Sequence, residues 1–294
     1  MTISMGLAGA GRRAAATYAP AIAGCDQVRF SGVWSHTPEA ARAVAENYGV
    51  PAYTDYDEFV AACQAVAFAV PPAAQPDLAA AAARRGNAIL LEKPIAADLA
   101  SAEQLAKALD RARVVSMVAL PWRFAAAVAQ FLDDDVPAVR AVGGNGRLIT
   151  TAPGTGVAEW LIPRGLLRGG GVDLLDLLDA ALGTIVAVRA HGDPQGWVGL
   201  MLEHQGGPMS EASLYAAVPE AASPSEVAEL GVYGPGGVAT INLAGAVELS
   251  AAVSMVSAFA QAVQDGTPQA LGVDHGRHLQ DVIEEAESYL LLSD

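Results

Sequence analysis

The sequence predicts an α/β protein in which a doubly wound parallel sheet is followed by an α+β domain with an open, mostly antiparallel sheet. Up to about residue 119, short apolar runs alternate with helix-like segments, which is typical of a parallel sheet covered by helices on both faces. Beyond residue 120, strand-like runs follow one another across breaks rich in Gly and Pro, as in hairpins. We therefore expect two domains, residues 1–119 and residues 120–294.

The first domain alternates strands and helices with clear boundary residues. Thr37 and Pro38 are a typical helix start, an N-cap followed by proline at the first helical position. Pro71 and Pro72 end a strand because proline has no N–H for the ladder, and Gly86 ends an Ala-rich helix. In chain order the expected elements are strand Ile3–Ala8, helix Arg12–Ala23, strand Val28–Ser35, helix Pro38–Tyr48, strand Ala65–Val70, helix Pro76–Arg85, strand Ala88–Leu91, helix Leu99–Arg111 and strand Val114–Val118. Right-handed crossovers between such strands give a doubly wound sheet.

The second domain has consecutive strands between helices. Leucines at helical spacing predict a helix over Val172–Leu182. The acidic run Asp133-Asp134-Asp135 is expected to form a solvated turn. The other expected elements are helix Phe124–Leu132, strand Val139–Ile149, strands Val186–Ala190, Trp197–Glu203, Glu211–Ala217, Val227–Val232 and Val238–Ile241, and helices Ala251–Asp265 and His278–Leu291.

Composition excludes several kinds of partner. The 294 residues include 32 Asp and Glu against 17 Lys and Arg, a formal charge of −15, which repels nucleic acid and anionic membranes. Cys25 and Cys63 are the only cysteines, too few for a disulfide framework or a zinc cluster, and no metal site is expected. The chain starts without a basic leader and lacks an apolar run long enough to cross a bilayer, so we expect a cytoplasmic protein.

A glycine-rich turn between the first strand and the first helix carries the first chemical signal. Gly9-Ala10-Gly11-Arg12-Arg13-Ala14 has the G-x-G-x-x-A form of the dinucleotide fingerprint. In that fingerprint the first glycine makes the tight turn, the second lets the backbone approach a pyrophosphate, and the small third residue lets the helix pack on the strand. The alternative interpretation is an ordinary Gly-rich turn.

The end of the second strand favours NADP over NAD. NAD sites usually place an acid there for the ribose 2′-hydroxyl, but this chain has Ser35, His36 and Thr37. These side chains can donate hydrogen bonds to a 2′-phosphate, and Arg12 and Arg13 can supply positive charge. The alternative is that both arginines are only solvated on the first helical turn.

A lysine follows the fourth strand directly, in Glu92-Lys93-Pro94. In a doubly wound sheet, ligands bind at the carboxyl ends of the strands. A lysine at that edge can hydrogen-bond a substrate hydroxyl or carbonyl and transfer its proton, with Glu92 orienting the amine.

These motifs, in this order, resemble the Gfo/Idh/MocA oxidoreductases. The resemblance rests on Gly9-Ala10-Gly11, Ala69-Val70-Pro71-Pro72, Glu92-Lys93-Pro94, Trp122-Arg123-Phe124 and Gly169-Gly170-Gly171. It implies an N-terminal Rossmann domain and a C-terminal domain whose open sheet forms homodimer or homotetramer contacts. It also implies oxidation or reduction of a sugar or cyclitol carbon with NAD(P). By position, Lys93 matches the catalytic lysine, Val70 and Pro71 match residues beside the nicotinamide, and Arg123 matches a residue of the interdomain cleft.

The chain departs from the family pattern where a catalytic histidine is usual. The segment Gly169–Asp179 has no histidine, and none of the five histidines of the chain lies near that position. Counting back from Ala180-Ala181-Leu182-Gly183 puts Asp173 there and implies a short deletion, whereas counting forward from the glycines puts Asp179 there. Asp176 shares a helix face with Asp173, so both are candidate catalytic carboxylates. The alternative is that these acids only suit the helix dipole. Gln75 is a second departure, since many members have His there.

We therefore expect an NADP-dependent oxidoreductase that transfers a hydride to or from a small polyhydroxylated or carbonyl-bearing substrate, such as a sugar, a cyclitol or a natural-product intermediate. A first alternative is a divergent member that keeps the nucleotide site but catalyses a non-redox or histidine-independent reaction, such as reduction of an imine or an activated carbonyl. A second alternative is a non-enzymatic nucleotide-binding protein.

Overall fold

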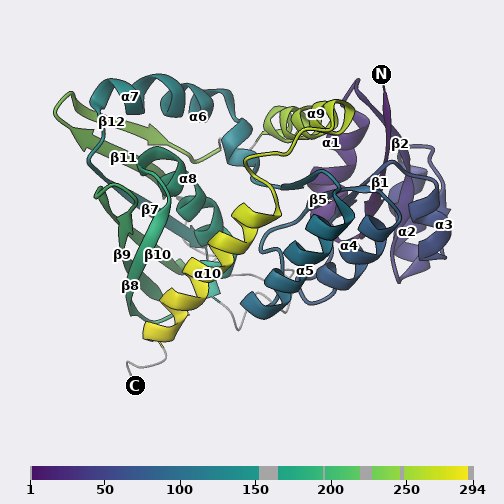
Figure 1. The fold of residues 1–294 in the computed structure, drawn as a ribbon, viewed down its shortest axis with the longest axis horizontal. Coiled ribbons are helices and arrows are strands. Elements are labelled where there is room, and N and C mark those ends of the chain that lie inside the picture. Colours follow the sequence, from purple (N-terminus) through teal and green to yellow (C-terminus); the bar gives the residue numbers. More distant parts are fainter. Residues whose placement is uncertain (1, 152–164, 195, 219–226, 246–247, 291–294) are drawn as a thin grey trace. The chain divides into compact units, whose positions relative to one another are not determined.

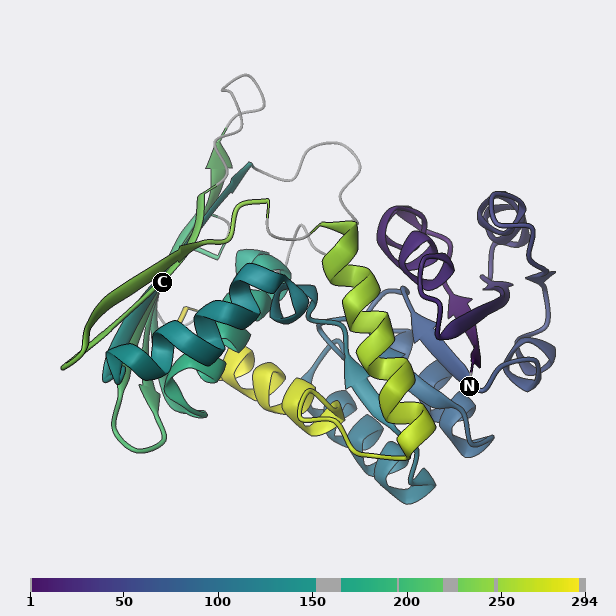
Figure 2. The same ribbon diagram turned by 90° about the horizontal axis from the view of Figure 1, so that it is seen from above.

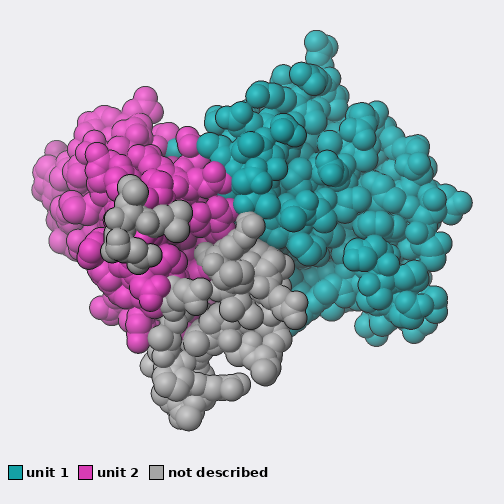
Figure 3. Space-filling model, turned by 90° about the horizontal axis from the view of Figure 1, so that it is seen from below, with its two compact units in different colours: residues 1–121, 248–280 teal, residues 122–247, 281–294 magenta. Residues whose placement is uncertain are grey.

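The computed structural model describes residues 2–151, 165–194, 196–218, 227–245 and 248–290 (Figure 1). The chain folds into two compact units, coloured separately in Figure 3. Unit 1 is Met1–Pro121 with Glu248–Gln280, and unit 2 is Trp122–Val247 with Asp281–Asp294. The expected boundary after residue 119 thus lies close to the first change of unit, but the chain returns to unit 1 at Glu248.

Unit 1 contains a six-stranded sheet whose neighbouring strands are all parallel, in the order β3-β2-β1-β4-β5-β6. This order confirms the doubly wound fold. All six residues of β1 are buried, as expected for a central strand with helices on both faces. The strands are β1 (Ile3–Ala8), β2 (Val28–Trp34), β3 (Ala52–Tyr53), β4 (Ala65–Phe68), β5 (Ala88–Leu91) and β6 (Ser116–Val118).

The helices of unit 1 form two groups. On one side α4 packs against α5, and on the other α1 packs against α9 (Figures 1 and 2). The helical segments are η1 (Ala14–Tyr18) with π-helical winding, α1 (Ala19–Ala23), α2 (Pro38–Glu46), α3 (Tyr56–Ala61), α4 (Gln75–Arg84), α5 (Leu99–Ala112) and α9 (Leu249–Asp265). The buried face of α9, which includes Met255 and Phe259, is the reason that this late segment belongs to unit 1.

The sequence interpretation missed β3 and α3. Strand β3 has two residues, too short for a detectable alternation. Helix α3 has a clear start signal, because the Asp55 side chain accepts a hydrogen bond from the Glu58 N–H at 2.9 Å. An acid or hydroxyl residue followed three positions later by Glu is the capping-box spacing, so this helix was predictable.

Unit 2 contains a mixed sheet in the order β12-β11-β7-β10-β9-β8. Strands β7 and β10 are parallel and all other neighbours are antiparallel, which confirms the open, mostly antiparallel sheet. The elements of this unit are η2 (Pro121–Phe124), α6 (Ala126–Gln130), η3 (Phe131–Asp135), α7 (Val136–Val139), β7 (Gly143–Thr151), η5 (Leu167–Gly171), α8 (Val172–Leu182), β8 (Ile185–Gly192), β9 (Trp197–His204), β10 (Met209–Val218), β11 (Val227–Gly234) and β12 (Gly237–Asn242). Helix α10 (Val273–Leu290) has residues in both units.

Helix α8 packs directly on β7, β10 and β11. A Cβ atom at Gly146 of β7 would lie 2.8 Å from Cδ1 of Leu174, so only glycine permits this approach. The alternation of exposed and buried residues along β9 shows that one sheet face carries the helix and the other is open. Among the described residues, no helix combines the length and the apolar character that crossing a membrane requires.

The expectation of a turn at Asp133-Asp134-Asp135 is wrong. These residues are exposed, but they lie in helical backbone that runs from Ala126 to Val139. Phe131 and Val136 are buried on the other side of the same helical segment. Burial of these apolar side chains keeps the segment helical, and the acids occupy its solvated face.

Candidate functional site

Four sequence motifs of unit 1 lie at one edge of its sheet. They follow β1, β2, β4 and β5, and in a parallel sheet the carboxyl ends of the strands meet at the same edge. Strand order reverses between β1 and β4, which is where doubly wound proteins bind ligands. The predicted site residues at this edge are Gly9, Ala10, Gly11, Arg12, Arg13, Ser35, His36, Thr37, Val70, Pro71, Glu92 and Lys93.

The glycine turn after β1 fits a pyrophosphate. Gly9 has φ +116°, and a Cβ atom there would lie 2.3 Å from the carbonyl oxygen of Ala69. A Cβ at Gly11 would meet no atom within 4 Å, so open space adjoins the start of the helix. Ala14 is completely buried, consistent with close packing of helix and strand. The turn thus leaves room for a phosphate at the positive end of a helix.

The loop after β2 presents polar groups without an acid. The Ser35 hydroxyl accepts a hydrogen bond from the Thr37 N–H at 3.2 Å, which shapes the loop before α2. His36, Thr37 and Arg12 are exposed. Arg13 has a different partner from the one predicted, because its Nε donates to the Glu92 carboxylate at 2.5 Å.

Glu92 is buried and is the centre of a hydrogen-bonded cluster. Its carboxylate accepts hydrogen bonds from Arg13, from the Tyr18 hydroxyl at 2.7 Å and from the Lys93 backbone N–H at 3.0 Å. Burial raises the pKa of Tyr18 well above its usual value, and the negative charge of Glu92 raises it further. The phenol therefore remains a hydrogen-bond donor, and the helix after the glycine turn is tied to the turn that carries Lys93. The sequence analysis missed Tyr18.

The backbone of the turn after β5 also has a side-chain partner, and the sequence did not indicate this pairing. Lys93 is largely buried at the carboxyl end of β5, and the Lys93–Pro94 peptide bond is cis. The Gln75 side chain, at the start of α4, is hydrogen-bonded to backbone groups of Glu92 and Ile95. Lys93 is thus held on a turn with partners on two different helical segments.

Unit 2 brings two predicted site residues together. Asp176 is 1% exposed on α8, and its Oδ1 accepts a hydrogen bond from Arg123 at 3.1 Å. Asp173 lies on the first turn of the same helix and is half-buried. Asp179, the alternative in the forward register, accepts a hydrogen bond from the Ile185 N–H at 2.8 Å and so connects α8 to β8. Asp176 and Asp179 therefore have structural partners within unit 2.

A buried arginine precedes the three glycines. Arg168 is 7% exposed, and its guanidinium binds both carboxylate oxygens of Glu287 on α10, at 2.7 and 2.5 Å. Glu284 lies 3.7 Å away from the same guanidinium. This pair fixes the segment that leads into α8. A charged residue beside Gly169 was visible in the sequence, but its partner more than 100 positions away was not.

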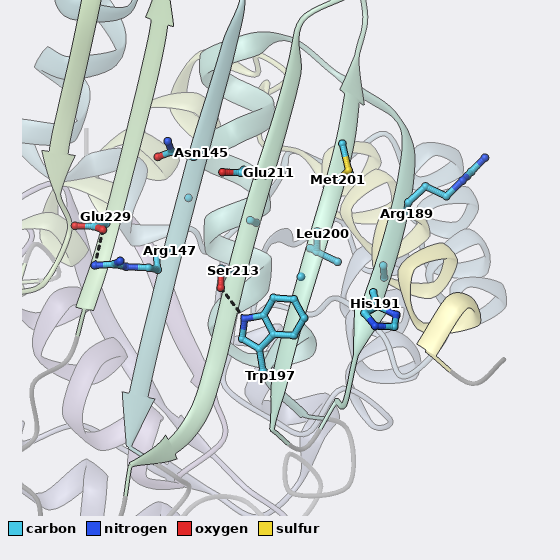
Figure 4. A pocket seen from close by; sticks show the side chains of 14 residues that line it. Asn145, Arg147, Arg189, His191, Trp197, Leu200, Met201, Glu211, Ser213 and Glu229 are labelled. Carbon is cyan, nitrogen blue, oxygen red and sulfur yellow. Dashed lines mark hydrogen bonds and ion pairs between the residues drawn. The ribbon is translucent and has the colours of Figure 1, made fainter. Parts of the chain in front are cut away.

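A cavity of about 570 Å³ lies on the open face of the unit 2 sheet (Figure 4). Trp197 and Met201 stand on this face, 45% and 60% exposed. The indole Nε1 donates to the Ser213 hydroxyl at 2.8 Å, and Arg147 pairs with Glu229 at 2.9 Å. The cavity therefore belongs to a broad surface of exposed apolar and charged side chains.

Comparisons with known proteins agree with this architecture. Residues 3–120 match the Gfo/Idh/MocA family, described as an oxidoreductase family with an NAD-binding Rossmann fold. An inositol 2-dehydrogenase of Rhizobium meliloti (strain 1021) is 35% identical over 149 residues, which are 50% of this chain and 42% of that enzyme.

Solved structures show that the fold similarity extends along the whole chain. The scyllo-inositol dehydrogenase of Lactobacillus casei, solved with NAD(H) and scyllo-inositol, superposes with a TM-score of 0.83 at 16% identity, covering 100% of this chain and 98% of that one. GenD2 of gentamicin A biosynthesis, solved with NAD, gives 0.86 at 21% identity, covering 99% and 94%. Residues 3–120, which carry the glycine turn and the Lys93 turn at one sheet edge, are thus similar to the NAD-binding Rossmann fold of the Gfo/Idh/MocA family, and the solved structures share the fold of the whole chain.

Proposed function

We propose that this chain is an NADP-dependent oxidoreductase that transfers a hydride to or from a carbon of a sugar, a cyclitol or a related carbonyl-bearing molecule. One observation carries the proposal: Lys93 is held on a buried turn at the same sheet edge as the Gly9–Gly11 turn. The inositol 2-dehydrogenase and the scyllo-inositol dehydrogenase named above support a cyclitol as substrate.

The residues present have separate tasks in this reaction. The helix after Gly11 would hold the pyrophosphate, and Val70 and Pro71 would adjoin the nicotinamide. When bound, the nicotinamide accepts or supplies the hydride. Lys93 hydrogen-bonds the substrate oxygen and takes its proton during oxidation or returns it during reduction. Glu92, with Arg13 and Tyr18, keeps the lysine turn in place.

The experiment that tests the proposal is a substrate panel with NADP+ and NAD+, including myo-inositol, scyllo-inositol and nucleotide sugars. We expect reduction of NADP+ with at least one cyclitol or sugar, with the keto product identified by mass. Tight NADPH binding without turnover on sugars, ketones or imines would contradict the proposal and favour a binding protein.

A second candidate function follows from the histidines of the described chain. His36 follows β2, His191 and His204 lie on the unit 2 sheet, and His275 and His278 lie on α10. The first turn of α8 carries Asp173 instead of a histidine. A histidine at that position would serve as the base that takes the proton of a substrate hydroxyl, and reduction of an imine or an activated carbonyl needs no such base. Turnover of imines without turnover of cyclitols would therefore favour this candidate.

The cofactor preference gives a prediction about Arg12. We expect NADPH to bind more tightly than NADH, and Arg12→Ala to weaken NADPH about tenfold or more but NADH by less than about twofold. A hydrogen bond to a charged phosphate contributes about 1.5–3 kcal/mol, and 1.4 kcal/mol is a factor of ten. Fluorescence titration of both nucleotides measures these constants.

Arg13→Ala is the comparison variant, because Arg13 is paired with Glu92. It should weaken both nucleotides to a similar degree. If Arg12→Ala weakens the binding of NADPH and NADH equally, Arg12 does not bind the 2′-phosphate.

The proposed function includes a homo-oligomer formed through the open sheet of unit 2. Exposed side chains on this face include Trp197, Met201 and Tyr233, at 45%, 60% and 46% exposure. Exposed apolar surface of this kind is typical of protein interfaces. The occupant we propose is the same face of a second copy, as the family resemblance implies.

Met201→Glu should therefore convert a dimer or tetramer into a monomer, because it places two like charges near each other across a two-fold axis. Light scattering after size exclusion measures the mass. Leu249→Glu is the control, since Leu249 is 53% exposed on α9 of unit 1 and lies outside this face. A wild-type monomer at micromolar concentration would overturn the proposed oligomer.

A further inference from the structure

The buried side chain of Gln75 forms hydrogen bonds with the turn that carries Lys93. Gln75 Nε2 donates hydrogen bonds to the Glu92 carbonyl at 2.8 Å and the Ile95 carbonyl at 2.9 Å. Gln75 Oε1 accepts a hydrogen bond from the Glu92 N–H at 2.8 Å. The amide of Gln75 therefore spans the turn from the residue before Lys93 to the residue after Pro94.

The same residue is tied to the neighbouring turn. The backbone N–H of Gln75 donates to the carbonyl of Pro71, which lies in the turn after β4, at 3.2 Å. Gln75 is 0% exposed, so water does not compete for its hydrogen bonds. A single residue thus links the turn after β4 to the turn after β5, which are neighbouring strands of the sheet.

The chemistry of an amide suits this task. A glutamine offers two N–H donors and one carbonyl acceptor in a planar group, and it carries no charge to lose or gain. Here both donors and the acceptor are used on backbone groups, so the turn has one geometry that satisfies all three bonds. Leaving the two buried carbonyls without donors is unfavourable, so the turn would rearrange in a variant that lacks the amide.

We propose that Gln75 is a positioning residue, which fixes Lys93 relative to the turn after β4 and so sets the rate of proton transfer. The inference rests on the proposed role of Lys93. Misplacement of a catalytic group by about 1 Å is enough to lower a rate about 10²-fold. The effect should therefore appear in kcat, while the nucleotide affinity, which depends on the glycine turn, changes little.

A second buried amide provides a matched control. Asn87 is 4% exposed, and its Nδ2 donates to the carbonyls of Val60 and Cys63 at 3.0 and 2.6 Å. Asn87 precedes the first residue of β5, at the opposite end of the strand from Lys93. Gln75→Met and Asn87→Leu therefore each remove two donors to buried backbone carbonyls, but only Gln75→Met removes them from the lysine turn.

The first measurement needs no substrate. Lys93 and Lys107 are the only lysines, so protein labelled with ¹⁵N-lysine gives two backbone amide signals, and Lys107→Arg assigns them. We expect amide exchange at Lys93 to be about tenfold or more faster in Gln75→Met, while exchange at Lys107 stays unchanged. Asn87→Leu should leave both signals unchanged. An unchanged Lys93 amide in Gln75→Met would overturn the proposal.

The second measurement is a kinetic cycle with the best cyclitol or sugar of the panel. Gln75→Met should lower kcat about 10–100-fold and change the NADPH dissociation constant less than about threefold. In a Lys93→Met background the same change should have no further effect, because Gln75 acts through the lysine. Equal losses in both backgrounds, or an equal loss in Asn87→Leu, would show a merely structural role.

Gln75→Glu is a second variant that can be used if Gln75→Met does not fold. An ionised glutamate keeps the acceptor for the Glu92 N–H but has no donors for the two carbonyls. Full activity of Lys93→Met would refute the proposed role of Lys93 in proton transfer, whereas the absence of turnover by the wild type on the whole substrate panel would refute the proposed function itself. In the first case, a faster exchange of the Lys93 amide would still show that Gln75 holds the turn, but without a role in proton transfer, and the positioning proposal would fail with it.

Discussion

Lys93→Met is expected to lower kcat about 10²–10⁴-fold while the fold and the NADPH dissociation constant stay nearly unchanged. This range is the usual contribution of a positioned proton donor or acceptor. Methionine keeps the length and the apolar stem of lysine and removes only the amine. Lys93 is 9% exposed at the sheet edge, so the apolar stem of methionine can occupy the same largely buried position. Steady-state kinetics with the best substrate of the panel measures the loss.

Lys107→Met is the matched control, because Lys107 is exposed on α5 and forms a surface pair with Glu103 at 3.4 Å. It should change kcat less than about twofold, as surface pairs contribute little. Asp173→Asn tests whether the candidate carboxylate on the first turn of α8 also carries a proton. A strong loss of kcat, together with a change in the acidic limb of the pH profile, would assign Asp173 that role. Near wild-type turnover of Lys93→Met would show that the amine carries no proton.

Arg123→Met is expected to lower the free energy of unfolding by about 3 kcal/mol, because it leaves the carboxylate of Asp176 buried without its cationic partner. Asp176 is 1% exposed and Arg123 lies 3.1 Å from it, so the charge cannot be solvated without local rearrangement. Chemical denaturation of the variant and the wild type measures the difference. Arg42→Met, which breaks an exposed pair with Glu39, should cost only about 0–1 kcal/mol.

A double variant separates a structural from a catalytic role of Asp176. Arg123→Met combined with Asp176→Asn should recover most of the lost stability, because no buried charge then remains. Asp176→Asn alone should keep kcat within about threefold if the carboxylate serves the ion pair. A loss of kcat comparable to that of Lys93→Met would instead place Asp176 among the catalytic residues.

The elements predicted from clear local patterns in the sequence agree closely with the structure. Strand β1 and helix α8 have the bounds that the apolar run and the leucine spacing predicted, Ile3–Ala8 and Val172–Leu182. Both signals are local, because burial on both faces or on one helical stripe is written into consecutive residues. The start of helix α3 is also encoded locally, by Asp55 as its N-cap. The helical conformation of Asp133-Asp134-Asp135 depends instead on buried neighbours.

The sequence by itself determined the doubly wound sheet, the glycine turn after β1 and the lysine after β5, since each is encoded in a short contiguous run. Only the tertiary structure decided which partners these residues have. Arg13 pairs with Glu92 across 79 positions, and Gln75 reaches Glu92 across 17. The same holds for Arg123 with Asp176 and Arg168 with Glu287, across 53 and 119 positions. Side chains from distant segments meet only when the strands and helices pack, and periodicity along the chain carries no information about those pairs.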